Sequence, residues 1–363
     1  MKSTPLNRML ERMVATRSGV WLVCAVYFIC YVPFIVLTRV LSGDELEFGD
    51  TMVGAEVLPI ATMTSVVVML AFIFASGWWR CAGQRRVGRF TVPWPGRWTA
   101  LSGLCTAVIL TTATMVFSLG VPIVLAMLVM RGGTLVIAPL VDALTGRRVH
   151  PTSWAALALA AAALTTAIKG RVDGDWNVAA TACVGAYLLA YFIRLQFMSR
   201  LAKTDDTEKT KRYFVEEQLV TSPVTIVLLG VAALSAELGQ VGGFFAQARS
   251  GFTEYWSLGF VLTAMGVGAA SQLVGIFGTL IFLNPRENSF ATALNRASST
   301  ISGVVAALVM VLLFSGKLPG LGEVAGVLLV LVAILVLSQR DRFDRWRAGV
   351  VRGVEGQSSG SSR

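Results

Sequence analysis

The stretch "LAMLVMRGGTLVIAPLV", residues 125–141, is an apolar run that carries one arginine, Arg131, near its middle. A helix in the core of a soluble protein hardly tolerates such a charge, because the buried guanidinium loses its hydration. A membrane helix tolerates it when the side chain faces the interior of a bundle or a water-filled space. The run therefore predicts a transmembrane helix whose arginine has a function.

The composition of the whole chain agrees with a membrane protein. Of its 363 residues, 55% are hydrophobic and only 14% are charged, whereas soluble domains carry about 25% charged residues. Ten apolar segments have about the length that crosses a bilayer. They are residues 19–41, 52–77, 98–119, 121–142, 152–169, 177–199, 214–236, 255–283, 289–314 and 320–338. Because these runs are continuous rather than alternating, we expect an all-α integral membrane protein with ten transmembrane helices.

The basic residues are distributed unevenly between the two sides of the predicted membrane. With a cytoplasmic N-terminus, 23 of the 31 lysines and arginines fall on the inner side. This positive-inside bias predicts that both termini are cytoplasmic and that the number of spans is even. The net charge of +10 is then a consequence of topology, with some attraction to anionic membrane lipid, and it does not indicate a nucleic-acid partner. Trp78, Trp79, Trp94 and Trp98 mark an interfacial belt.

The sequence divides into four regions. We expect a cytoplasmic N-terminal segment at 1–18, two five-helix repeats at 19–170 and 171–339, and a basic, then disordered cytoplasmic tail at 340–363. Charged residues precede the first full-length span, so we expect no cleavable signal peptide, and we place the protein in the bacterial inner membrane. The five cysteines form no CxxC, His150 is the one histidine, and there is no GxxxxGK[ST]. We therefore expect no metal, no other cofactor and no enzymatic activity.

The two predicted repeats share features at an offset of 164 to 165 residues. The matching features are "YFI" at 27–29 and 191–193, Pro59 and Pro223, Phe117 and Phe282, and Arg131 and Arg296. Because each repeat holds an odd number of spans, the second must enter the membrane from the opposite side, which makes the repeat inverted. At about 1.5 Å per residue, Arg131 and Arg296 then lie near the same depth, on opposite sides of one central cavity.

In each half, the end of a fourth span, a short turn and a final span rich in small residues resemble the drug/metabolite transporter superfamily. The two stretches are "VDALTGRRVHPTSWAALALAAAALTTAI" and "VMVLLFSGKLPGLGEVAGVLLVLVAILVLS". The chain resembles EamA-like members and, through its arginines, nucleotide-sugar or organic-phosphate transporters. Many members carry Gly-Glu after the fourth helix, where this chain has Gly146-Arg147-Arg148. The resemblance implies a central cavity lined by spans 1–4 and 6–9, with spans 5 and 10 at the periphery as a homodimer contact.

Arg131 and Arg296 are the main candidates for substrate binding. Guanidinium groups offer forked donors to a carboxylate or phosphate, and no acidic residue is expected at their depth. The alternative is a structural or gating bond. Tyr27, Tyr191, Gln272 and Thr112 are candidates to line the cavity. Aromatic packing is the alternative for the tyrosines, and bonding between helices is the alternative for Gln272 and Thr112.

Four further residues are candidates for coupling or gating. Glu56 is a candidate for proton coupling, unless it is an interfacial carboxylate or an arginine partner. Arg194 lies close enough to the inner end of its span to snorkel to the interface. Pro59 and Pro223 are expected about a third of the way along their spans, where they would bend matched helices.

Together these residues predict a secondary transporter that moves a small organic, anionic solute by alternating access. One rival is an exporter of cationic or lipophilic drugs in which the arginines are gate elements. A membrane enzyme and a non-transporting scaffold are the rivals from other classes.

Overall fold

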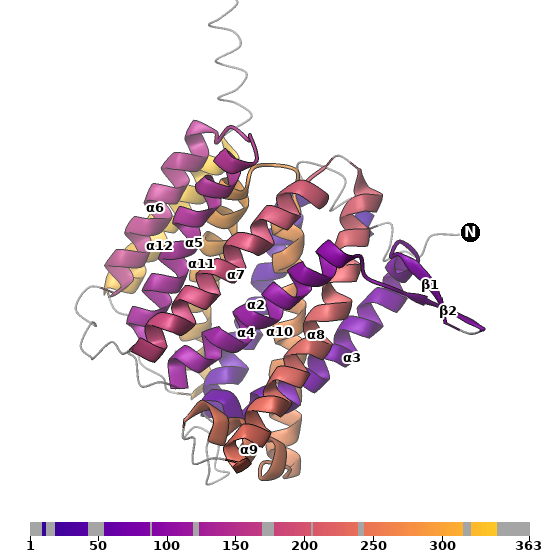
Figure 1. Ribbon diagram of the computed structural model, residues 1–363. Coiled ribbons are helices and arrows are strands. Elements are labelled where there is room, and N and C mark those ends of the chain that lie inside the picture. Colours follow the sequence, from indigo (N-terminus) through magenta and orange to yellow (C-terminus); the bar gives the residue numbers. More distant parts are fainter. Residues whose placement is uncertain are drawn as a thin grey trace, which may run out of the picture.

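A computed structural model describes residues 9–11, 19–42, 54–87, 89–118, 123–168, 178–204, 206–238, 243–314 and 321–339. These residues form a bundle of α-helices with a short antiparallel hairpin at one side (Figure 1). The elements are α2 (Gly19–Ser42), η1 (Gly54–Glu56), α3 (Leu58–Ser76), η2 (Trp78–Arg80), β1 (Gln84–Val87), β2 (Phe90–Pro93), α4 (Arg97–Ser118), α5 (Ile123–Leu144), α6 (Pro151–Ile168), α7 (Val178–Leu201), α8 (Thr207–Leu238), α9 (Phe244–Thr253), α10 (Leu258–Phe282), α11 (Asn288–Phe314) and α12 (Leu321–Ser338).

Seven helices in the described part of the chain are long and apolar enough to cross a membrane. They are α2, α3 together with η1, α4, α7, α8, α10 and α11. Their outer faces expose large apolar side chains such as Ile29, Val67, Val227 and Leu312. Such faces suit lipid, and a helix satisfies its own backbone hydrogen bonds there. The predicted class, an all-α membrane protein, is therefore confirmed.

Three elements differ from the sequence expectation. The hairpin β1–β2 pairs Gln84 with Pro93 and Val87 with Phe90, where no strand was expected. Helix α9 occupies part of a predicted link, and α8 begins at Thr207 rather than at residue 214. All three segments are polar or mixed in sequence. The search for apolar runs finds the membrane-crossing part of a helix and misses polar structure beyond it.

The contacts between helices follow a two-fold pattern. We match the long helices of 19–170 in order with those of 171–339, so that α2, α3, α4, α5 and α6 correspond to α7, α8, α10, α11 and α12. The contacting pairs α2–α10, α3–α10 and α2–α11 then correspond to α7–α4, α8–α4 and α7–α5, which also contact. The contacting pairs α3–α8, α5–α11 and α6–α12 correspond to themselves. Exchanging the two sets of helices therefore preserves these contacts.

Two glycines mark equivalent helix crossings in this pattern. A Cβ at Gly103 of α4 would lie 2.7 Å from the Glu217 carbonyl oxygen of α8, and one at Gly268 of α10 would lie 2.3 Å from the Ala61 carbonyl oxygen of α3. Only glycine permits such close approach of two backbones. At each crossing a hydroxyl one turn further on, Thr221 or Ser65, donates to the glycine carbonyl, at 3.2 and 2.9 Å.

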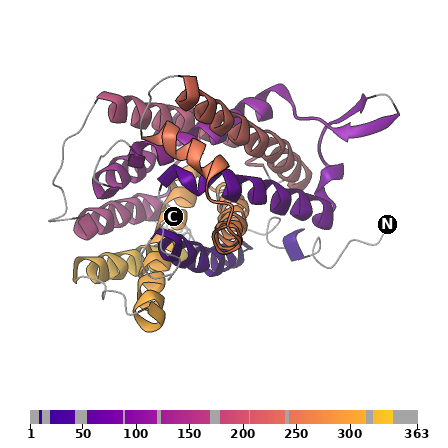
Figure 2. The ribbon, with the colours of Figure 1, turned by 90° about the horizontal axis from the view of Figure 1, so that it is seen from below.

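Helices α6 and α12 lie together at one side of the bundle, away from the hairpin (Figures 1 and 2). The buried residues of α6 include the small Ala156, Ala160 and Ala163, while Trp154 is exposed. Small side chains allow close helix packing. The alanine-rich α6 therefore packs against α12, α11 and α5 of the same chain.

Candidate functional site

Two arginines occupy corresponding positions in two contacting helices. Arg131 follows the first residue of α5 by eight positions, and Arg296 follows the first residue of α11 by eight. Helices α5 and α11 contact each other. Both arginine side chains are half-buried, so each retains accessible surface although it lies within a long helix of the bundle. The sequence-predicted pair of arginines therefore belongs to adjacent elements.

Neither arginine has an acidic partner among the described residues. The Arg296 guanidinium donates to the Thr134 hydroxyl of α5 through Nε, at 3.3 Å, and Nη2, at 3.1 Å. The Arg296 Cζ also lies 6.0 Å from the centre of the Tyr191 ring. In the described part of the chain the Arg131 guanidinium forms no hydrogen bond and no ion pair. Within the described part of the chain, no carboxylate therefore pairs with either positive charge.

Four tyrosines on α2 and α7 interact electrostatically with one or both arginines. Tyr27 and Tyr31 are one turn apart on α2, with ring centres 5.2 Å apart, and Tyr187 and Tyr191 are one turn apart on α7, at 5.5 Å. All four interact electrostatically with Arg296. Tyr27 and Tyr187 also interact with Arg131, which places both guanidinium groups near the same two tyrosines.

The sequence interpretation found Tyr27 and Tyr191 and missed three neighbours. Tyr31 and Tyr187 lie four residues from the predicted tyrosines, a spacing that places side chains on one helix face. That spacing was the signal available for them. Thr134, three residues after Arg131, carried no comparable signal, because a hydroxyl in an apolar run is ordinary.

Corresponding positions of the two sets of helices make corresponding contacts beside the arginines. Gly133 of α5 packs against Leu188 of α7, and Ser298 of α11 meets Cys24 of α2, with the Ser298 Oγ 2.6 Å from the Cys24 Sγ. Residue 298 follows 133 by 165 positions, and 188 follows 24 by 164. These are the offsets that relate Arg131 to Arg296 and Tyr27 to Tyr191.

The first half of α11 is polar and yet buried. Its buried polar residues are Asn288, Ser289, Thr292, Asn295, Ser298, Ser299 and Ser302. In a membrane protein such residues face the bundle interior, because lipid offers no hydrogen bonds. The Thr292 hydroxyl has no hydrogen-bond partner among the residues that the structure describes. Buried polar side chains therefore extend along α11 from its N-terminus past Arg296.

Arg194 does not snorkel, so that interpretation was wrong. Its side chain is buried, and its Nε donates to the Glu217 Oε1 of α8 at 2.7 Å. Glu217 is fully buried and also accepts from Ser102 and Thr106 of α4, each at 3.0 Å. Pairing with a carboxylate that has its own hydroxyl donors offsets the cost of burying both charges. The guanidinium also donates to Thr279 of α10.

One end of the bundle is closed by hydrogen bonds between the two sets of helices. Asp142, near the end of α5, is fully buried and accepts four hydrogen bonds from the start of α11. Its Oδ1 accepts from the Asn288 backbone N–H and Nδ2, both at 2.8 Å, and its Oδ2 accepts from the Ser289 N–H at 2.8 Å and Oγ at 2.7 Å. A carboxylate at a helix N-terminus is stabilised by unpaired N–H groups and by the helix dipole.

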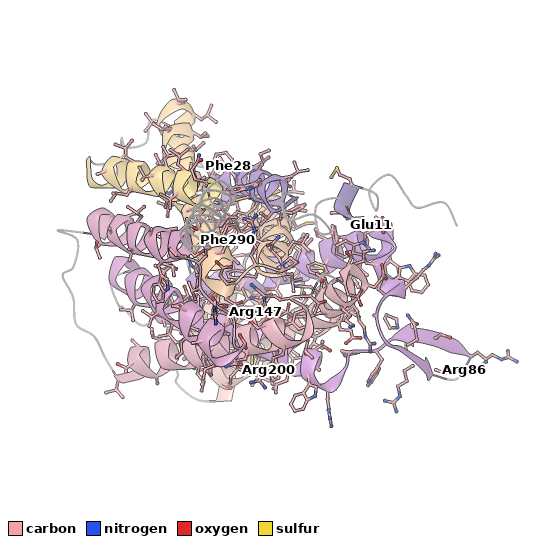
Figure 3. The ribbon with its side chains drawn as sticks, turned by 90° about the horizontal axis from the view of Figure 1, so that it is seen from above. Glu11, Phe28, Arg86, Arg147, Arg200 and Phe290 are labelled. Carbon is pink, nitrogen blue, oxygen red and sulfur yellow. The ribbon has the colours of Figure 1, made fainter. Side chains whose placement is uncertain are left out.

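Arg147 extends this closed end. Gly146 adopts a left-handed conformation, with φ of 70°, which ends α5 and turns the chain. The Arg147 guanidinium then donates to the carbonyls of Pro285, Ser199 and Lys203, at 2.9, 3.3 and 2.7 Å. Seen from above, Arg147 lies near the middle of the molecule (Figure 3). We call Asp142, Arg147, Lys203, Asn288 and Ser289 the polar seal.

Lys203 is an unusual member of the polar seal. Burial lowers the pKa of its amine from 10.5 to about 7; Arg147 adds to the lowering, while Asp142 and Glu287 oppose it. The Lys203 Nζ donates to the Arg286 carbonyl at 2.9 Å. The seal therefore contains a group that titrates near neutral pH.

Thr112 and Gln272, the other predicted cavity residues, form no hydrogen bond with either arginine within the described residues. The Thr112 hydroxyl donates to the Val108 carbonyl of its own helix at 2.6 Å. Gln272 is buried on α10 and makes no hydrogen bond within the described residues. Glu56 lies in η1, ahead of α3, where Ser250 of α9 approaches its carboxylate at 3.5 Å and Gly251 packs on its carbonyl.

The two prolines do not occupy matched positions. Pro59 lies in the first turn of α3, where the missing N–H costs no hydrogen bond and no bend results. Pro223 lies in the interior of α8. The equivalent crossings pair Ala61 with Glu217 and Ser65 with Thr221, an offset of 156 residues, which does not pair the prolines. The prediction that both prolines bend matched helices is therefore wrong.

Comparison with known proteins identifies a fold and no family. No protein-family model matches the chain. No curated protein matches it. A solved structure described as "Crystal structure of protein" is similar over 88% of this chain and 96% of that chain, with a TM-score of 0.53 and 17% sequence identity. At this identity the similarity concerns the fold alone.

Proposed function

We propose that this protein is a ten-span secondary transporter that moves a small organic anion across the membrane by alternating access. The observation that carries the proposal is the pair Arg131 and Arg296, which has no acidic partner among the described residues. Insertion scales give a cost of about 2.5–3.5 kcal/mol for one arginine at the centre of a membrane helix. A bound carboxylate or phosphate offsets this cost through charge-assisted hydrogen bonds.

The four tyrosines suit the same role. Their hydroxyls add donors and acceptors around the two guanidinium groups, and their rings provide apolar walls. We therefore propose a solute with one acidic group and an organic body, held between α2, α5, α7 and α11. No cofactor is part of this proposal.

The exchangeable helix contacts support an inverted repeat, as in the drug/metabolite transporter superfamily that the sequence resembles. Each repeat has five spans in this proposal, so a two-fold axis in the membrane plane relates them. Rocking of one set of helices against the other exposes the arginines to each side in turn. The polar seal closes the inner side in the present conformation.

The positive-inside bias orients the proposed transporter. The links 145–150, 202–206 and 283–287 are then cytoplasmic, as are both termini, and we place the protein in the bacterial inner membrane. The lipid-facing surfaces of α6 and α12, including the exposed Trp154 and Leu335, are the proposed contact in a homodimer.

Transport by purified protein in liposomes tests this function. Labelled carboxylates and phosphate monoesters are offered beside labelled organic cations, and uptake is measured for the wild type, Arg131→Gln and Arg296→Gln. Arg200→Gln is the matched control, because Arg200 is exposed at the end of α7. We expect an anion to be transported and each site variant to lose at least about 90% of the rate, since each removes charge-assisted hydrogen bonds.

Three results would contradict the proposal in different ways. Transport of cations alone favours the drug-exporter alternative. Undiminished anion transport by both site variants removes the arginines from the binding site. No transport of any solute favours a scaffold or a membrane enzyme.

A further inference from the structure

We propose that the hairpin between α3 and α4 is a binding site for the headgroups of anionic phospholipids. We call residues 78–98 the arginine–tryptophan hairpin. It joins two of the helices that are long and apolar enough to cross a membrane, Gly54–Ser76 and Arg97–Val116. Its position at their shared end places it at a membrane surface. It projects from the side of the bundle (Figure 1), and Arg86 lies at the outer edge of the molecule (Figure 3).

The charge of this hairpin is of one sign. Residues 77–101 contain Arg80, Arg85, Arg86, Arg89 and Arg97 and no aspartate or glutamate. All five arginines are exposed. Within the described residues, Arg85, Arg86, Arg89 and Arg97 form no ion pair. A surface with this charge is complementary to an anionic leaflet.

Tryptophans hold three of the arginines in defined positions. Arg85 stacks over Trp94 at 4.8 Å, Arg97 over Trp98 at 4.9 Å, and Arg80 over Trp79 at 5.1 Å. A stacked guanidinium keeps its N–H edge free for phosphate oxygens. Trp94 and Trp98 are about half exposed, at 49% and 48%, and indole rings favour the headgroup region.

The base of the hairpin is fixed to α8. The buried Glu216 carboxylate accepts from the backbone N–H groups of Gly83 and Gly96, both at 2.9 Å, and from the Thr99 hydroxyl at 2.6 Å. Trp78 is buried edge-on against Phe214, with ring centres 5.6 Å apart. The arginines are therefore carried on a preorganised element, which lowers the entropic cost of binding.

These observations favour a lipid over a soluble phosphate compound. The two flanking spans hold the hairpin at the bilayer edge, and the exposed indoles add an apolar contact that a soluble anion does not need. The proposal does not depend on the transport function.

The test uses the full chain in nanodiscs that contain a mixture of phosphatidylglycerol and phosphatidylcholine. Native mass spectrometry counts the phospholipids that remain on the protein after its release. The test variant is Arg85→Gln/Arg86→Gln. The control is Arg200→Gln/Lys209→Gln, which removes two exposed positive charges from the same end of the bundle. Arg85→Lys/Arg86→Lys keeps the charge.

We expect the preference for phosphatidylglycerol to fall about tenfold in the hairpin Gln variant, from the attraction that each arginine supplies near an anionic surface. The control and the Lys variant should keep most of it. Equal loss in the hairpin variant and the control would mean a general charge effect and overturn the proposal, as would no loss at all. Displacement of the retained lipid by millimolar inorganic phosphate would instead indicate a site for soluble phosphate.

Discussion

Arg131, Arg194 and Arg296 lie within long helices, away from the helix ends, and their surroundings differ. Arg194 meets a buried carboxylate, Glu217, whose remaining hydrogen bonds come from Ser102 and Thr106. Arg296 donates to Thr134, and both Arg131 and Arg296 interact electrostatically with Tyr27 and Tyr187. The first pair is electrically complete and stabilises the packing of α7 against α8 and α4. In the proposed function the other two charges bind an anion.

The ion pair of Arg194 and Glu217 predicts a large loss of stability when one partner is removed. Glu217→Gln leaves the buried guanidinium without a counter-charge, and the expected cost is about 3–5 kcal/mol. The measurement is thermal unfolding of the purified protein in detergent. Glu208→Gln is the control, because the Glu208 side chain is 68% exposed. A melting temperature equal to that of the wild type in Glu217→Gln would show that the pair is not stabilising.

Lys203 predicts a dependence of stability on pH. Below pH 7 its amine is charged in the folded and unfolded protein, and the full cost of burying the charge is present. Between pH 7 and 10.5 the folded protein has lost the proton while the unfolded protein keeps it, so the free energy of unfolding rises with pH. Unfolding of the wild type and of Lys203→Met is therefore compared at several pH values.

We expect Lys203→Met to be the more stable protein at pH 6, and its advantage to shrink by about 1 kcal/mol per unit above pH 7. Lys209→Met serves as the control, because the Lys209 side chain is 65% exposed. A constant difference between wild type and Lys203→Met from pH 6 to 9 would contradict the lowered pKa.

At the scale of elements, the apolar runs located the long helices to within a few residues in most cases, because hydropathy reports directly what lipid demands. The start of α8 was missed, and this hid the partner of Arg194. With a start at residue 214, Glu217 would lie in the first turn of the helix. Because α8 begins at Thr207, Glu217 lies well inside it and within reach of Arg194.

The site was predictable in part for a related physical reason. A charge in an apolar run is conspicuous, so Arg131 and Arg296 were found. The polar seal around Asp142 was not predicted, because a carboxylate near a helix end is usually solvated. Its burial depends on α11 beginning beside it, a contact between residues 146 positions apart.

The polar seal predicts that Asp142→Asn loosens the contact between α5 and α11. The substitution replaces one carboxylate oxygen with an NH2 group, which cannot accept from the N–H and O–H donors of α11. Two of the four hydrogen bonds are therefore lost. The reporter is Thr292→Cys in a cysteine-free background, since Thr292 is fully buried one turn beyond Ser289. We expect a membrane-impermeant maleimide to label this cysteine several-fold faster in Asp142→Asn.

Asp206→Asn is the matched control for the seal, because Asp206 is an exposed carboxylate at the same end of the bundle. Equal labelling rates in Asp142→Asn and in the unaltered background would show that the seal does not limit access from this end.

At the scale of the whole molecule, the main contacts of the two sets of helices in the described residues correspond when the sets are exchanged, and some sequence matches follow the same pairing. Arg131 and Arg296, Tyr27 and Tyr191, and the Gly133–Leu188 and Ser298–Cys24 contacts are related by an offset of 164 or 165 residues. The residues of α3 and α8 at the crossings with α10 and α4 are related by a different offset, 156 residues, as between Ala61 and Glu217. A single offset therefore could not align the two halves, and the prolines were matched wrongly.

Arg131 and Arg296 lie on helices where the two sets meet, and neither has a carboxylate partner among the described residues. Such a site costs stability when it is empty, and functional sites often carry this cost. We therefore expect Arg131→Gln and Arg296→Gln, without solute, to be at least as stable as the wild type. Their stability thus distinguishes them from Glu217→Gln, which is expected to be less stable because it breaks the buried ion pair with Arg194.

Equilibrium binding of an anionic solute to the purified protein tests the central claim most directly. Carboxylates and phosphate monoesters are first screened by thermal stabilisation, and the affinity of the best anion is then measured calorimetrically. We predict that Arg131→Gln and Arg296→Gln each weaken binding about tenfold or more while the empty proteins remain as stable as the wild type. Arg200→Gln should bind normally. Unchanged affinity in both site variants would contradict an anion site formed by the two arginines.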